Sequence, residues 1–157
     1  MTYVNGLPTH VLLVHFIVVL APITALLVVV CGVWAAARTR LIWPTLGAAV
    51  FVMVLTPLTT EAGEHFKATF PQTPPAVEQH AELGDTMLYV SAAILIAALA
   101  VTLVHLRPVA APVKWGIAAL AVVIGVFACI QTFRIGESGS RAVWGDSRVQ
   151  SMPVEPR

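Results

Sequence analysis

The segment at residues 87–106, MLYVSAAILIAALAVTLVHL, contains no Asp, Glu, Lys or Arg. A helix of about 20 residues rises about 30 Å, which matches the hydrocarbon core of a bilayer. A continuous apolar run favours a helix over a barrel strand, because barrel strands alternate in polarity and end after about ten residues. The segment therefore predicts a membrane-spanning helix.

Three other segments share this character, and the composition agrees with them. The chain has 157 residues, of which 58% are hydrophobic and 11% charged, far from the balance of a soluble domain. The predicted spans are residues 9–37, 41–62, 76–106 and 113–136. We expect an all-α membrane protein, an antiparallel four-transmembrane-helix bundle formed by residues 1–145, with a flexible tail at residues 146–157.

The charged residues predict that both termini lie outside. The first basic residues, Arg38 and Arg40, follow the first span, which argues against a cleavable signal peptide and places this loop in the cytoplasm. Arg107 and Lys114 lie on the same side. All eight acidic residues then fall on the outer side: Glu61, Glu64, Glu78, Glu82, Asp85, Glu137, Asp146 and Glu155. We therefore expect the chemistry of the protein at the outer end of the bundle.

Small residues and prolines predict how the spans pack. The fourth span carries Ala121, Gly125, Cys129 and Thr132 along one face, a pattern typical of close helix contacts in membranes. Pro22 and Pro57 each remove a backbone donor and are expected to kink their helices. The two cysteines, Cys31 and Cys129, fall at different depths and are not expected to form a disulfide.

Histidines are the first candidates for chemistry at the outer end. His10 and His15 are five residues apart, which rotates them by about 140° on a helix, so they do not share a face. His15 is the deeper residue, and an ionisable group inside a span is a functional candidate; a histidine bonded to a carbonyl is the alternative. His80 aligns with Gly84 and Met87 and is expected to face the bundle.

Carboxylates and arginines near these histidines suggest a polar network. Glu61 and His65 lie four residues apart, so a continued helix would place them on one face. Glu78, Glu82 and Asp85 are expected to face water or a partner. Arg134 lies near the apolar boundary and is expected to pair with a carboxylate such as Glu61, Glu64 or Glu137.

Four blocks occur in order along the chain: LPTHVLLVH at 7–15, PLTTEAGE at 57–64, EQHAELG at 78–84 and RIGESG at 134–139. Together they resemble the bacterial membrane-protein family known as domain of unknown function 2231, in its actinobacterial form. The resemblance implies a four-helix bundle in the bacterial cell (inner) membrane and, through relatives fused to iron–sulfur or cytochrome modules, a connection to electron transfer. The chain departs from the family pattern at Val11, where proline is common, and at Glu137, where histidine is common.

Two classes of function remain. In the first, the protein is an electron-transfer protein: His15 and His80 ligate a b-type haem, or His10, Glu61, His80 and Glu137 hold a metal ion. In the second, it is a non-catalytic membrane subunit whose outer polar network presents an acidic face to a membrane-protein partner, such as a respiratory one. That network adds these residues to the histidines: Glu64, His65, Glu82, Arg134 and Arg141. We favour the second class, because no nucleophile with an adjacent base is recognisable. A net charge of +1 without a basic patch excludes a nucleic-acid partner.

Overall fold

The computed structural model describes the backbone of residues 3–4, 7–69 and 71–150 and the side chains of residues 9–69 and 71–145. Within these ranges the helices are α1 (Thr9–Val33), α2 (Ala35–Lys67), α3 (Pro75–Asp85), α4 (Met87–Leu106) and α5 (Ala111–Gln150). Two short strands, β1 (Tyr3–Val4) and β2 (Leu7–Pro8), pair antiparallel before α1. The sequence did not predict this pair.

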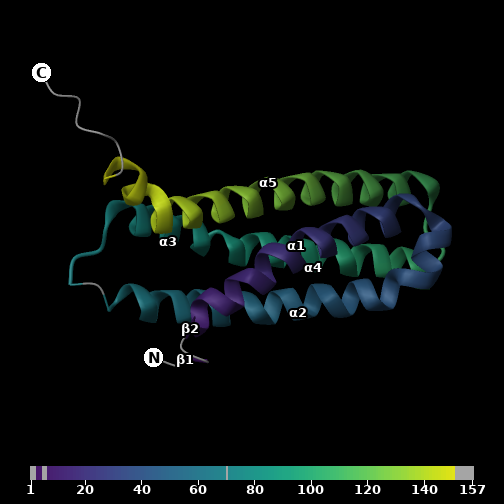
Figure 1. Ribbon diagram of the computed structural model, residues 1–157. Coiled ribbons are helices and arrows are strands. Elements are labelled where there is room, and N and C mark those ends of the chain that lie inside the picture. Colours follow the sequence, from purple (N-terminus) through teal and green to yellow (C-terminus); the bar gives the residue numbers. More distant parts are fainter. Residues whose placement is uncertain (1–2, 5–6, 70, 151–157) are drawn as a thin grey trace, which may run out of the picture.

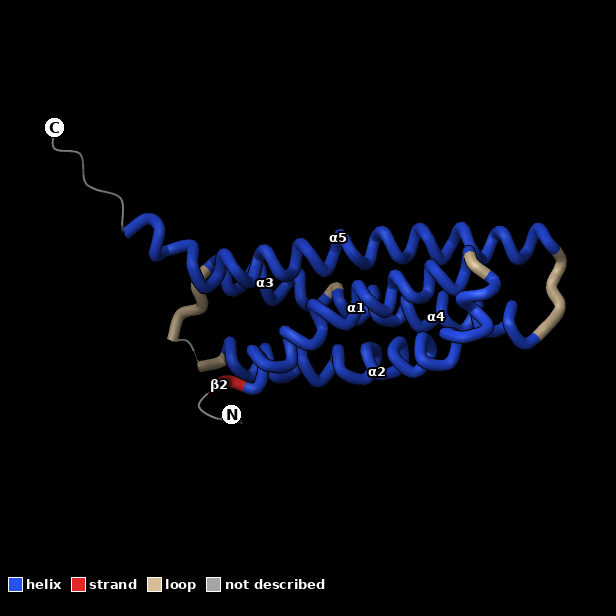
Figure 2. Tube along the Cα trace, turned by 45° about the vertical axis from the view of Figure 1, so that its right-hand side comes forward, coloured by secondary structure: helices blue, strands red, loops and turns tan. Residues whose placement is uncertain are grey.

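The long helices form an antiparallel bundle (Figures 1 and 2). The neighbours around it are α1 with α2, α2 with α4, α4 with α5, and α5 with α1. Four helical segments, with α3 and α4 counted as one, are long and apolar enough to cross a membrane. The predicted four-span, all-α membrane fold is therefore confirmed.

Two helix boundaries differ from the predicted spans at the end where α1 meets α2. Trp34 has extended backbone angles, φ −117° and ψ 107°, and separates the two helices inside the span predicted at residues 9–37. Arg38 thus belongs to α2. Its guanidinium is buried and Nη1 donates to the carbonyls of Cys31 (2.9 Å) and Gly32 (3.2 Å), groups that the end of α1 would otherwise leave without partners.

At the other end of the bundle the helices are longer than predicted. α2 continues to Lys67 and α5 to Gln150, beyond the expected ends at 62 and 136. Residues 146–150 of the predicted tail are therefore helical, and residues 151–157 lie outside the described part of the chain. Both α1 and α2 continue through Pro22 and Pro57, and both cysteines are free thiols.

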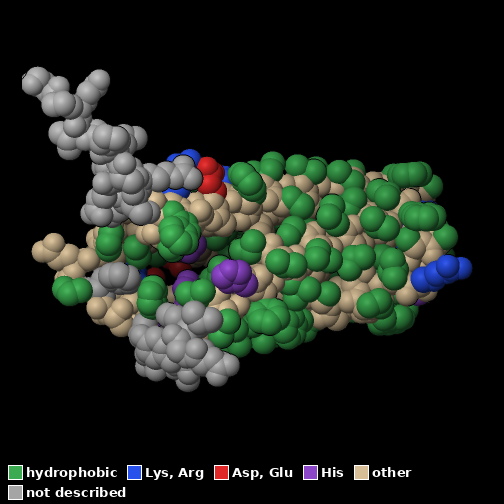
Figure 3. Space-filling view, viewed as in Figure 1, with side chains coloured by type: hydrophobic (Ala, Val, Ile, Leu, Met, Phe, Trp, Pro, Cys, Tyr) green, Lys and Arg blue, Asp and Glu red, His purple; other side chains and the backbone are tan. Residues whose placement is uncertain are grey.

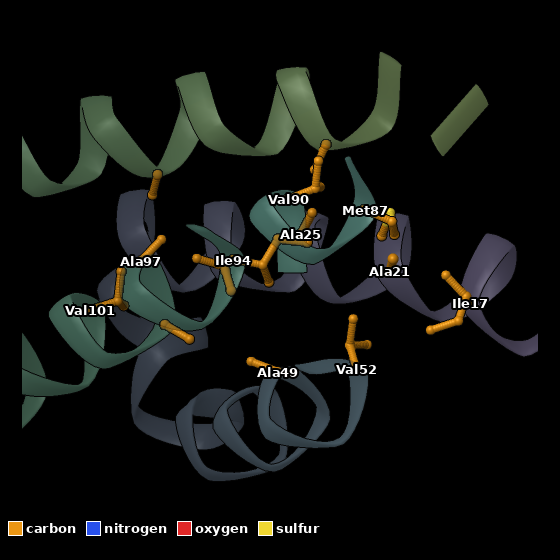
Figure 4. Packing of buried hydrophobic residues seen from close by; sticks show 14 of the residues in the cluster. Ile17, Ala21, Ala25, Ala49, Val52, Met87, Val90, Ile94, Ala97 and Val101 are labelled. Atoms are coloured by element: carbon orange, nitrogen blue, oxygen red, sulfur yellow. The ribbon is translucent and has the colours of Figure 1, made fainter. Parts of the chain in front are cut away.

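The core combines branched aliphatic side chains with seven alanines, and these small side chains allow close approach of the helices (Figure 4). Of the small residues predicted as a packing face of the fourth span, Ala121, Gly125 and Thr132 are buried and Cys129 is half-buried. At Gly125 an added Cβ would lie 2.5 Å from Val29 Cγ2. This glycine therefore sets the distance between α1 and α5.

The second half of the bundle repeats the first. A constant shift of 76 residues relates α2 to α5, and every pair in the following list is buried on both sides. The pairs are Ile42 with Ala118, Thr45 with Ala121, Ala49 with Gly125, Val52 with Ala128, Leu55 with Gln131, Thr56 with Thr132, and Thr59 with Ile135.

A shift of 70 residues relates α1 to α3 and α4 in the same way. It pairs His10 with His80, and it pairs buried Ile17 with buried Met87. The helix order around the bundle is unchanged when α1 and α2 are exchanged with α4 and α5. The matching burial and the helix order are therefore those of a tandem repeat of two helical pairs.

Candidate binding chamber

One end of the bundle, here called the acidic end, carries the start of α1, the ends of α2 and α5, and all of α3 (Figure 1). The acidic side chains that the structure describes all belong to these segments: Glu61, Glu64, Glu78, Glu82, Asp85 and Glu137. The opposite end, the basic end, carries Arg38, Arg40, Arg107 and Lys114.

A cavity of about 100 Å³ lies at the acidic end, and we call it the chamber. Its wall is mostly apolar, and helices of both halves contribute to it. The lining residues are His10, Val14, Ile17, Val18, Thr56, Thr59, Thr60, Gly63, Glu64, Phe66, Lys67, Val77, His80, Ala81, Gly84, Asp85, Met87, Thr132 and Ile135. Figure 3 shows a hollow at this end with histidine side chains inside it.

The first chamber histidine is held by α2. His10 Nδ1 lies 3.0 Å from the carbonyl oxygen of Thr59, and its ring lies so close to Gly63 that an added Cβ would be 2.7 Å from His10 Cε1. The ring also stacks with Phe66 at 6.4 Å between centroids. The absence of a side chain at Gly63 therefore leaves the space that the His10 imidazole occupies, and any side chain there would displace the ring.

The second chamber histidine is held by α5 in an equivalent way. His80 Nδ1 lies 2.9 Å from Ser138 Oγ, which donates to the carbonyl of Ile135 at 2.8 Å. An added Cβ at Gly139 would lie 3.0 Å from His80 Cε1.

The repeat explains this likeness. With the 76-residue shift, Glu61-Ala62-Gly63 aligns with Glu137-Ser138-Gly139, and Thr59 aligns with Ile135. Each histidine therefore rests on the glycine of a Glu-x-Gly segment in the partner helix of its own half.

These contacts fix the hydrogen on each imidazole. A carbonyl only accepts, so Nδ1 of His10 is the donor to Thr59. The single hydrogen of the Ser138 hydroxyl goes to Ile135, so Nδ1 of His80 donates to Ser138. In neutral imidazoles this leaves both Nε2 atoms as acceptors with free lone pairs. The rings lie 6.4 Å apart, centroid to centroid, at an interplanar angle of 69°. Both residues line the chamber, so two neighbouring imidazoles, each with an acceptor nitrogen, form part of its wall.

A third polar group of the chamber has no partner. Thr132 is 3% exposed, and its hydroxyl makes no hydrogen bond to any described part of the chain. The equivalent Thr56 donates to the carbonyl of Val52 at 2.8 Å. A buried hydroxyl without a hydrogen-bond partner costs free energy. A bound molecule that pairs with the Thr132 hydroxyl would remove this cost.

Carboxylates and cations surround the chamber without filling it. Glu64 and Asp85 line it but are exposed. Lys67, which also lines it, forms an ion pair with Glu78 at 2.9 Å. The charged groups therefore lie at its rim, and the interior polarity comes from imidazoles and hydroxyls.

The other residues expected at the site lie elsewhere. His15 is exposed, does not line the chamber, and its Nδ1 donates to Val11 of its own helix at 2.5 Å. His65 is exposed and bonds the carbonyl of Glu61 at 2.8 Å. Ligation of haem by His15 and His80 stays a prediction. The geometry does not favour it, because the structure does not bring the two residues together and a chamber of about 100 Å³ suits one small ring rather than a porphyrin.

The predicted network of acids and arginines lies mainly on the surface. Arg141 pairs with Glu137 at 2.7 Å, but both side chains are exposed. Arg134 reaches Gln131 at 3.5 Å, and Glu82 is exposed.

The predicted metal ligands are also not brought together as a set. Among the described residues, no three His, Cys, Asp or Glu side chains are grouped closely enough to hold a metal ion. Of the predicted metal ligands, His10 and His80 meet in the chamber, whereas Glu61 and Glu137 do not line it.

Sequence reasoning missed Ser138, Gly63, Gly139 and Thr132 as parts of the site. The signal that would have revealed the first three is the repeated Glu-x-Gly segment, which lies 76 residues apart in the two halves. The free hydroxyl of Thr132 has no sequence signal, because the same residue type at the equivalent position bonds its own helix.

Comparison with known proteins agrees with this architecture. Residues 6–150 match the family described as "predicted membrane protein (DUF2231)". The chain belongs to this family. A search of curated proteins and a search of solved structures each found no match. Membership supports a multi-pass membrane protein, and the description assigns no activity.

Proposed function

We propose that this membrane protein is a binding protein rather than an enzyme, and that it takes a small lipid-soluble molecule into the chamber at its acidic end. The observation that carries the proposal is the combination of an apolar wall with two acceptor nitrogens and one unpaired hydroxyl. Binding sites for small molecules are typically apolar pockets in which a few placed polar groups fix the orientation.

The depth of the chamber favours a ligand that is soluble in lipid. His10 lies in the first turn of α1, and Ile17 lines the chamber seven residues further on, about 10 Å deeper along the helix. The chamber therefore extends from the level of the membrane surface towards the hydrocarbon core. A strongly charged ligand would lose its hydration there without a matching charge inside.

A non-catalytic role agrees with the lining residues. Among the residues that the structure describes, no serine or cysteine lines the chamber, and its carboxylates are exposed at the rim. We place the acidic end on the outer side of the bacterial inner membrane. There the exposed acids Glu82 and Asp85 are available to a membrane-protein partner.

The test uses a fluorine-labelled 4-alkylphenol as the probe, with the full chain in nanodiscs of synthetic phosphatidylcholine. Its hydroxyl can donate to an Nε2 atom, and ¹⁹F NMR reports bound probe. We expect saturable binding that is lost in Ala81→Phe, which fills the chamber, and kept in the control Ala119→Phe, whose site is an exposed position of α5. Equal probe binding by the two variants would refute the proposal.

A transition-metal ion is the second candidate occupant of the histidine pair. It is favoured by the anchored Nδ1 atoms, because metal-binding histidines usually donate their other ring N–H to a carbonyl or similar group. Metal analysis of the purified protein tests it. Stoichiometric zinc or copper that disappears in His10→Ala and His80→Ala, but not in His65→Ala, would replace the lipid-soluble ligand as the occupant.

A further inference from the structure

Thr132 differs from the other buried threonines of the bundle. Four of those threonines donate their hydroxyl hydrogen to the backbone carbonyl four residues earlier, at 2.7 to 2.8 Å. They are Thr24, Thr56, Thr59 and Thr102. Thr132 is equally buried and lies within the helical part of α5, yet its hydroxyl has no partner in the part of the chain that the structure describes. The usual way of satisfying a helical threonine is therefore not used here.

The repeat shows that the helix geometry does not impose this state. Thr56 is the equivalent residue of the first half, also lines the chamber, and bonds Val52. At this pair of equivalent positions, the first half thus presents a satisfied hydroxyl to the chamber and the second half a free one. A buried free hydroxyl in a wall of this kind is explained by a ligand atom that completes its hydrogen bonding.

The free hydroxyl and the histidines mark two levels of the chamber. Ser138, which holds His80, is six residues beyond Thr132 on α5, a rise of about 9 Å. A six-membered ring with hydroxyls at its 1 and 4 positions spans this rise when the hydrogen bonds of about 2.8 Å at its two ends are bent away from the line through the two oxygens. The volume of about 100 Å³ is somewhat below the roughly 150 Å³ of a cavity that binds benzene, so a ring enters with small outward movements of the lining side chains.

The chemistry at the two levels differs. At the histidine level both Nε2 atoms accept, so a ligand must present an O–H or N–H there. At the lower level the hydroxyl of Thr132 both donates and accepts. Phe66 and Met87 line the chamber, and ring edges and thioether sulfur pack well against an aromatic ring.

From these observations we infer that the ligand is an aromatic 1,4-diol, a lipid-soluble quinol in its reduced form. One hydroxyl donates its single hydrogen to Nε2 of His10 or of His80, and the other hydroxyl meets Thr132. This inference rests on the proposed function, because it names the chemical class of the molecule bound in the same chamber. The oxidised quinone has only acceptor oxygens, so it cannot donate to either Nε2 atom.

The experiment compares three probes that share one alkyl chain: the 1,4-hydroquinone kept reduced under nitrogen, the 4-alkylphenol, and the quinone. Each competes with the fluorinated phenol on the full chain in quinone-free nanodiscs. We expect the hydroquinone to bind about tenfold more tightly than the phenol and than the quinone, the change expected for one good hydrogen bond.

Variants at the two equivalent threonines provide the control. Thr132→Val is expected to weaken hydroquinone binding about tenfold and to leave phenol binding unchanged, whereas Thr132→Ser keeps the preference. Thr56→Val removes a hydroxyl that already bonds its own helix, so it is expected to change neither affinity. Thr132→Ser is also the safeguard if Thr132→Val fails to fold.

The outcomes separate the two proposals. If phenol and hydroquinone bind the unaltered protein equally, or Thr132→Ser abolishes the preference, the quinol assignment is overturned while binding of a lipid-soluble ligand stands. If no probe binds more tightly to the unaltered protein than to Ala81→Phe, the proposed function fails and the quinol assignment with it.

Discussion

The imidazoles of His10 and His80 lie 6.4 Å apart, centroid to centroid, at the meeting point of the two halves of the bundle. Each is oriented by the second long helix of its own half: His10 by Thr59 and Gly63 of α2, His80 by Ser138 and Gly139 of α5. The pair therefore forms only when all four of the long segments are assembled. Neither half alone contains two free acceptor nitrogens in one cavity.

Gly63 should not tolerate even one methyl group. In Gly63→Ala the new Cβ would lie 2.7 Å from His10 Cε1 and 2.9 Å from Nδ1, so the ring must move and its bond to Thr59 is lost. Overpacking of this kind costs about 1–3 kcal/mol. We expect a lower thermal midpoint in detergent and weaker binding of the phenol probe.

The control for this change is Gly47→Ala, because an added Cβ there meets nothing within 4 Å. Alanine is the better helix former by up to about 1 kcal/mol, so the midpoint should stay or rise. A Gly63→Ala protein as stable as the control, with unchanged probe binding, would show that the position of the His10 ring does not depend on its close contact with Gly63.

Gly125 is expected to control the spacing of α1 and α5. An alanine there would place Cβ 2.5 Å from Val29 Cγ2 and 3.6 Å from the carbonyl of Ala25. We expect Gly125→Ala to destabilise the protein by about 1–3 kcal/mol. Thermal unfolding in detergent measures the effect.

Val29→Ala provides the rescue, since it removes the methyl that the new Cβ would strike. The double variant should recover most of the loss caused by Gly125→Ala, so the two effects should not add. Strict additivity would mean that the tight contact is relieved elsewhere.

The fold was predictable because the number of spans depends on the average hydropathy of segments about 20 residues long. Four apolar runs without charge decide the number of spans and the helical class, whatever the details of their packing. Helix ends were less predictable. Trp34 ends a helix within a continuous apolar run. α5, in contrast, continues through Gly136 and Gly139, because packing against neighbouring helices stabilises a helix that local propensity alone would not.

The site was predictable only in part. His10 and His80 were among the predicted ligands, and the acidic end was expected to carry the chemistry. The relative rotation of α1 was not available from the sequence: the 140° between His10 and His15 means that only one of them faces the bundle, and the structure has His10 inside and His15 exposed. The haem hypothesis chose the deeper histidine, His15, as the partner of His80, whereas the structure brings His10 and His80 together.

The Arg38 guanidinium is expected to stabilise the turn between α1 and α2. It is 7% exposed and bonds the carbonyls of Cys31 and Gly32. Arg38→Leu leaves both carbonyls without these bonds at a cost of about 2 kcal/mol, which corresponds to a fall in thermal midpoint of about 4–8 °C for a chain of this size. Arg40→Leu alters an exposed basic residue two positions away and should shift the midpoint by less than about 2 °C. Equal shifts would mean that loss of charge, not loss of the cap, is responsible.

The orientation of the bundle is tested by labelling two exposed positions at its opposite ends. Gln79 precedes His80 at the acidic end, and Thr39 lies between Arg38 and Arg40 at the basic end. The basic end should be cytoplasmic, because short loops rich in Lys and Arg are retained there. Intact cells treated with a membrane-impermeant maleimide should therefore label Gln79→Cys, and Thr39→Cys only after permeabilisation. The unchanged chain is the background control, since Cys31 is buried and Cys129 half-buried. Labelling of Thr39→Cys from outside would reverse the orientation and place the chamber at the cytoplasmic face.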